Sequence, residues 1–87
     1  MARLFIPPPM RSMTAERDVV EVQGATIRDA IDGLESLYPG TKAMLCRDGQ
    51  LRPGLMVAVD SAIATSGLRE PLSANSEVHF LPAIGGG

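Results

Sequence analysis

The C-terminal residues are the ones whose types and order could do chemistry. Residues 80–87 read Phe-Leu-Pro-Ala-Ile-Gly-Gly-Gly. Pro82 cannot donate to a strand ladder and the glycines have no side chains to pack, so we expect this tail to protrude. An extended chain from Pro82 to Gly87 spans about 20 Å at roughly 3.3 Å per residue. Such a tail could enter another protein's active site and present the carboxylate of Gly87.

A free carboxylate is a poor electrophile until one of its oxygens becomes part of a good leaving group, as in an acyl-adenylate. The sequence contains no GxxxxGK[ST] phosphate-binding loop. It also shows no pattern typical of a metal cluster, a catalytic triad or a cofactor loop. We therefore expect that this chain is not an independent enzyme, that it binds no cofactor, and that a partner supplies any activation.

Two other reactive residue types occur once each in the sequence. His79 alternates with Val78 and Phe80, so it should lie on the opposite face of a strand from them, as a contact or solvated histidine and not a catalytic base. Cys46 could be a redox thiol, but a lone loop cysteine is more often inert or partly buried. A single cysteine cannot form an internal disulfide or a zinc site, which suits a reducing cytosol.

Length and composition restrict the function further. A chain of 87 residues allows one domain, and its 45% hydrophobic content with no Trp indicates an aliphatic core. The net charge of −2, with the basic residues scattered, argues against a nucleic-acid partner. No apolar run approaches the roughly 20 residues of a membrane span, and no secretory signal is present. We expect a soluble cytoplasmic protein with no membrane partner.

One helix is expected from Thr26 to Tyr38. Thr26 with Asp29 resembles a capping box, although Asp replaces the usual Glu or Gln. Pro39-Gly40 should end the helix. Gly33 lowers the helix propensity by roughly 1 kcal/mol relative to Ala, so packing on a sheet must hold the helix. Its apolar stripe consists of Ile27, Ala30, Ile31, Leu34, Leu37 and Tyr38.

The remaining periodic segments indicate strands. Residues 4–6 and 18–22 should pair as a hairpin with a long connection that contains Pro7-Pro8-Pro9. A strand at 55–59, a turn at Asp60-Ser61, a short return at 62–64 and a last strand at 77–81 follow the helix. Residues 41–54 carry turn signals at 48–49 and 52–54 and are expected to be irregular. This order predicts an α+β fold with a mixed sheet packed against one main helix, which is the β-grasp order.

Residues 26–38, 56–60 and above all 78–87 resemble the ubiquitin-like sulfur carriers. These include the small subunit of molybdopterin synthase and the carriers of thiamine and cysteine biosynthesis. The resemblance implies a β-grasp domain over residues 1–81 and a flexible tail over residues 82–87. It also implies that Gly87 is adenylated and then converted to a thiocarboxylate. The tail residues that would enter a partner's active site are Pro82, Ala83, Ile84, Gly85 and Gly86.

The same resemblance implies three kinds of partner. The first is an E1-like adenylating enzyme that uses ATP and Mg, and the second is a sulfur donor. The third is an acceptor synthase, either the large subunit of molybdopterin synthase or a cysteine or thiazole synthase. The segment from Pro39 to Gly54 makes the chain longer than a minimal thiamine carrier, which favours the molybdopterin or cysteine type.

Alternatives remain open at this stage. The family usually ends in two glycines, so Gly85 either occupies the variable position before them or Gly87 must be trimmed to expose Gly86. A protein modifier would transfer the same activated glycine to lysine amines on target proteins. A non-covalent interaction module would tolerate truncation after Ile84.

Overall fold

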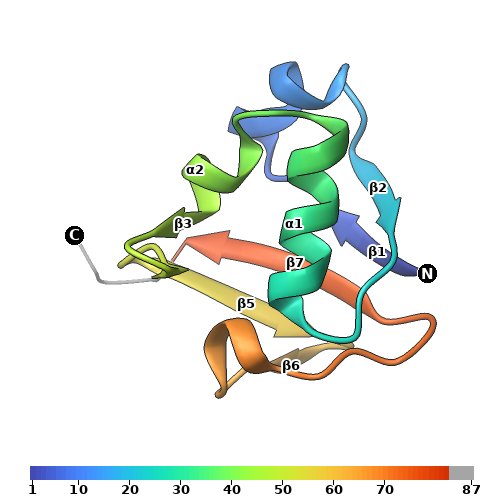
Figure 1. Cartoon of the computed structure of the whole chain (residues 1–87), viewed down its shortest axis with the longest axis vertical. Helices are drawn as coiled ribbons and strands as arrows, with labels where there is room; N and C mark the ends of the chain where they lie inside the picture. The colour runs from blue at the N-terminus through green and yellow to red at the C-terminus, as the bar shows by residue number, and fades with distance from the viewer. Residues whose placement is uncertain (83–87) are drawn as a thin grey trace.

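A mixed sheet of strand order β2-β1-β7-β5-β6 forms one layer of the molecule (Figure 1). The computed structural model describes residues 1–82. The first and last strands, β1 and β7, are parallel neighbours near the centre of the sheet, and the other neighbouring pairs are antiparallel. The strands are β1 (Ala2–Phe5), β2 (Val19–Val22), β5 (Leu55–Val59), β6 (Ala62–Ile63) and β7 (Glu77–Pro82).

Helix α1 (Ile27–Leu37) crosses one face of this sheet (Figure 1). Its N-cap is Thr26, whose hydroxyl oxygen accepts a hydrogen bond from the Asp29 amide at 3.3 Å. The Asp29 carboxylate in turn accepts from the Ala25 amide at 3.2 Å, so Asp takes the reciprocal role that Glu or Gln has in a capping box. The predicted helix and the predicted fold class, an α+β β-grasp, are confirmed.

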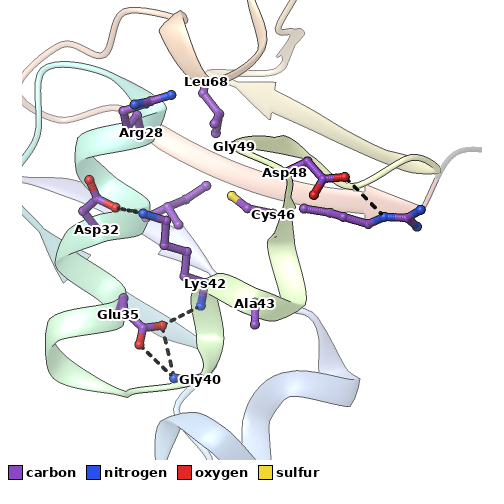
Figure 2. Close-up of a pocket in the computed structure, with 12 residues that line it drawn as sticks. Arg28, Asp32, Glu35, Gly40, Lys42, Ala43, Cys46, Asp48, Gly49 and Leu68 are labelled. Carbon is purple, nitrogen blue, oxygen red and sulfur yellow. Dashed lines mark hydrogen bonds and ion pairs between the residues drawn. The ribbon is translucent and has the colours of Figure 1, made fainter.

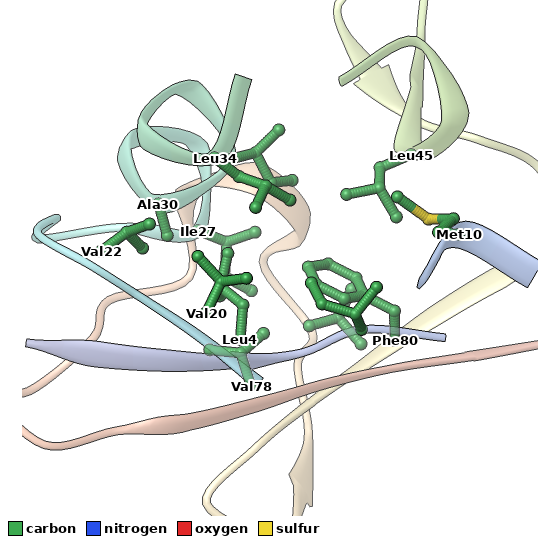
Figure 3. Close-up of a cluster of buried hydrophobic side chains, with 13 residues drawn as sticks. Leu4, Met10, Val20, Val22, Ile27, Ala30, Leu34, Leu45, Val78 and Phe80 are labelled. Carbon is green, nitrogen blue, oxygen red and sulfur yellow. The ribbon is translucent and has the colours of Figure 1, made fainter. Parts of the chain in front are cut away.

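The core lies between α1 and the sheet (Figure 3). Leu4 and Val78 from the central strands and Leu34 from α1 are 0% exposed. The helical stripe is confirmed for Ile27, Ala30, Ile31 and Leu34, which are all buried, but the prediction is wrong for Leu37, which is 57% exposed. At about 100° per residue, Leu37 points about 80° away from Ile27 around the helix axis, at the margin of the stripe.

The segment predicted to be irregular, residues 41–54, is ordered, so that prediction is wrong. It forms α2 (Thr41–Leu45) and a small hairpin of β3 (Cys46–Arg47) and β4 (Gln50–Leu51). The Glu35 carboxylate of α1 accepts hydrogen bonds from the amides of Gly40 at 3.1 Å and Lys42 at 2.9 Å, which stabilises the start of α2. These donors lower the pKa of Glu35.

The backbone conformations of both short hairpin turns agree with the turn signals in the sequence. Asp48 and Gly49 have φ of 55° and 75°, and Asp60 and Ser61 have φ of 51° and 73°. Positive φ at both central residues belongs to the hairpin turn whose twist matches the flanking strands. The long connection between β1 and β2 contains a 3₁₀ helix, η1 (Pro8–Thr14), and a second one, η2 (Gly67–Arg69), precedes β7. Within residues 1–82, none of the helices is long and apolar enough to cross a membrane.

Candidate functional site

Strand β7 positions the base of the C-terminal tail. It pairs with β1 on one side and β5 on the other, and Pro82 is its last residue, opposite Leu55. The strand is one residue longer than predicted. Its inward side chains Val78 and Phe80 are 0% and 5% exposed, so the strand is held in the core at these two positions. The other predicted tail residues, Ala83, Ile84, Gly85, Gly86 and Gly87, lie outside the described residues.

An apolar groove of about 530 Å³ lies beside the end of β7, and we name it the exit groove. Two of its side chains are exposed hydrophobics, Met44 at 47% and Leu81 at 40%. Arg52 donates from Nε to the Ala43 carbonyl at 2.9 Å, which holds its guanidinium against α2. The lining residues are Pro7, Pro8, Pro9, Met10, Met44, Leu45, Arg52, Pro53, Gly54, Leu55, Phe80 and Leu81.

Sequence reasoning missed the exit groove. Pro7-Pro8-Pro9 were expected only within the long connection between the first two strands, and residues 52–54 only as a turn. These segments meet only because η1, α2 and the start of β5 converge at one end of the sheet. The one signal in the sequence was the apolar run of three prolines and a methionine at residues 7–10.

The open face of the sheet, opposite α1, carries His79. Its ring stacks on Phe5, with ring centroids 4.1 Å apart and planes 11° from parallel. The two residues are direct cross-strand partners in the parallel β1–β7 register, and Arg3 and Glu77 form an ion pair two positions earlier in the same register. The prediction that His79 is a contact histidine is confirmed.

A second hollow, of about 450 Å³, lies between α1, α2 and the β3–β4 hairpin, and we name it the α1–α2 pocket (Figure 2). Cys46 lines it and is partly buried, as expected. Burial raises the pKa of the Cys46 thiol, while nearby Lys42 and Arg28 act in the opposite direction. The thiol is therefore protonated near neutral pH. Residues 1–82 contain no group of three His, Cys, Asp or Glu side chains able to hold a metal ion.

The fold and this arrangement define a class. The parallel pairing of β1 with β7, the antiparallel strands outside them and the single crossing helix make the chain a ubiquitin-like β-grasp protein. The strand that ends in the glycine tail is central in the sheet. The sequence profile of the ThiS family matches residues 6–87, and the chain belongs to this family of ubiquitin-like sulfur carriers.

Solved structures agree with this assignment. A chain of the BexX/CysO complex of Amycolatopsis orientalis is 30% identical, with 100% of both chains covered and a TM-score of 0.89. CysO of Mycobacterium tuberculosis is 25% identical over 97% of this chain and 100% of its own, with a TM-score of 0.88. SAMP1 of Haloferax volcanii is 26% identical over 99% and 98%, with a TM-score of 0.73. No curated protein matches the sequence.

Proposed function

We propose that this protein carries sulfur as a thiocarboxylate on Gly87, and that the catalytic steps belong to its partners. In the first step a carboxylate oxygen of Gly87 attacks the α-phosphorus of ATP held with Mg by an E1-like enzyme, and pyrophosphate leaves. In the second step a sulfur nucleophile from a donor attacks the carbonyl carbon. The bond from that carbon to the adenylate oxygen breaks, and AMP leaves.

The observation that carries this proposal is the family match, which extends through β7 and the terminal glycines. The structure supports the delivery of the tail, because β7 is paired with β1 as far as His79 and with β5 as far as Pro82. Glycines after that point suit a narrow channel, since they have no Cβ to meet its walls. Pro82, Ala83, Ile84, Gly85 and Gly86 are the proposed lead into the channel.

The exit groove is the proposed contact surface for the activating enzyme and the synthase. It is apolar, it begins beside Pro82, and its exposed Leu81 and Met44 have no cover within residues 1–82. The similarity to CysO in two organisms favours a cysteine-type synthase as the acceptor.

Intact mass spectrometry of the protein from its native cell, with sequencing of the C-terminal peptide, tests the proposal. We expect one oxygen of the Gly87 carboxylate to be replaced by sulfur. A version lacking Gly86 and Gly87 is the control and should carry no such replacement. An unmodified carboxylate under all growth conditions would refute the proposal and favour the non-covalent module.

The second candidate is a protein modifier. The similarity to SAMP1 of Haloferax volcanii, named in a further structure as small archaeal modifier protein 1, supports it. This function predicts Gly87 joined through an amide bond to lysines of other proteins. Covalent ladders in cells that disappear when the terminal glycines are removed would distinguish it from the carrier.

A further inference from the structure

The only lysine and the only cysteine of the sequence lie four residues apart and line the same pocket (Figure 2). Lys42 is on α2 and Cys46 follows directly on β3. Apart from these two, the sequence contains no ε-amine and no thiol. The α1–α2 pocket thus gathers the side chains that react best with an activated acyl group.

Lys42 and Cys46 would be targets of a side reaction if Gly87 is activated as proposed above. An acyl-adenylate at Gly87 reacts with any free amine: nitrogen forms an amide bond to the carbonyl carbon, the bond to the adenylate oxygen breaks, AMP leaves, and the amine loses a proton to solvent. A thiolate would form a thioester in the same way. Either reaction between two copies would consume the activated chain before sulfur arrives.

Lys42 is held as an ammonium. Its Nζ donates to Oδ1 of Asp32 at 2.6 Å, across the gap between α2 and α1 (Figure 2). The ion pair raises the pKa of Lys42, chiefly through the hydrogen bond to Asp32. Arg28 opposes this effect, and the Glu35 carboxylate is occupied by backbone amides of Gly40 and Lys42. An ammonium has no lone pair with which to attack a carbonyl.

The nucleophilic reactivity of Cys46 is lowered in a different way. Its side chain is partly buried between α1 and the β3–β4 hairpin, and burial disfavours the thiolate, which is the nucleophilic form. The negative charge of Asp32, which lines the same pocket, adds to this effect, and the positive charges of Lys42 and Arg28 oppose it. One carboxylate therefore acts against both nucleophiles.

We propose that Asp32 protects the activated chain from acylating other copies of itself, by holding Lys42 as an ammonium and by keeping negative charge beside Cys46. Asp32 is a positioning residue in this role, because it acts through Lys42 and Cys46 and is not itself one of the reacting groups. The proposal rests on the carrier function and gives a reason why an activated chain would not acylate Lys42 of further copies.

The first test measures Lys42 without any use of the C-terminus. Wild type, Asp32→Asn and Asp48→Asn are treated with the N-hydroxysuccinimide ester of acetic acid at pH 8, and acetylated Lys42 is quantified by peptide mass spectrometry against a lysine reference peptide. Asp48→Asn is the matched control. It removes one carboxylate, which lies 4.0 Å from Arg47 and belongs to a side chain that is 92% exposed. We expect Asp32→Asn to be acetylated about two- to fivefold faster, the range for an exposed ion pair. Equal rates in all three proteins would overturn the proposal.

The second test uses the full chain carrying a thioester of 2-mercaptoethanesulfonate at Gly87, made chemically so that no activating enzyme is needed. We expect covalent dimers linked through Lys42, identified by peptide mass spectrometry, to form a few times faster in Asp32→Asn than in wild type, and these Lys42-linked dimers to be lost in Asp32→Asn/Lys42→Arg. Dimer formation at the wild-type rate in Asp32→Asn would refute the protection. If both tests give the expected result but native Gly87 carries no sulfur, the carrier function is refuted. The conclusion that Asp32 lowers the reactivity of Lys42 then remains valid.

Discussion

The start of β7 depends on one buried hydroxyl, and its removal has a predictable cost. Ser76 is 1% exposed. Its Oγ accepts a hydrogen bond from the Ser73 amide at 2.9 Å and donates to Oδ2 of Asp60 at 3.0 Å. The other oxygen of Asp60 accepts from the Glu77 amide at 2.9 Å, so the hydroxyl links the β5–β6 turn to the first residue of β7.

Ser76→Ala leaves the Ser73 amide without its partner and removes one donor to Asp60. The change removes two hydrogen bonds of a buried side chain, and each such bond contributes about 0.5 to 1.5 kcal/mol. We therefore expect the free energy of unfolding to fall by about 1 to 3 kcal/mol in total. For a domain of this size, that lowers Tm by about 4 to 24 °C.

The assay is urea and thermal unfolding followed by circular dichroism, with Ser73→Ala as the matched control. Ser73→Ala removes an exposed hydroxyl that contacts Ser76 at 3.0 Å but keeps the Ser73 amide bond, so it should change the unfolding free energy by less than about 0.5 kcal/mol. A Ser76→Ala loss no larger than the control's would refute the reasoning, because the hydroxyl would then not be the connection between the turn and the strand.

Three further predictions concern the tail, the groove and the thiol. Gly86→Ala should leave the unfolding free energy within about 0.5 kcal/mol of wild type, and it should slow adenylation roughly tenfold or more because the added methyl meets the channel wall; equal rates in pyrophosphate release would contradict this. Leu81→Ser should weaken binding to the activating enzyme about threefold to eightfold by calorimetry, since burying the exposed 40% of a leucine contributes about 0.6 to 1.2 kcal/mol, whereas Leu37→Ser, on α1, should not. Burial raises the pKa of Cys46 above its ordinary value of 9.0, so thiolate appears only at higher pH and alkylation by iodoacetamide should still accelerate beyond pH 9; a plateau below pH 8.5 would disprove the burial effect.

Local signals in the sequence predicted α1 and most of the sheet. Thr26 and Asp29 satisfy amides within the first turn of α1, and Asp60-Ser61 forms a turn between residues adjacent in sequence, so both features depend on neighbours that the sequence shows. The alternation around His79 placed its ring on the open face for the same reason.

Segment 41–54 shows where such reasoning fails. Helix α2 is too short for a periodic stripe, and the carboxylate that stabilises its start comes from Glu35 on another helix. Strands β3 and β4 are two residues each, below the length at which alternation is visible. Turn residues at 48–49 were recognised, but the pairing on either side of them was not.

The sequence by itself determined the helix, the alternating strands and the glycine tail, and from these the family resemblance, because each is written in residues close together along the chain. Only the tertiary structure decided that β7 runs parallel to β1 at the centre of the sheet. The same holds for the exit groove, whose prolines and methionines come from three separate segments. It also holds for Asp32 facing Lys42 and Cys46, since long-range packing of α1 against α2 sets the distance between those charges.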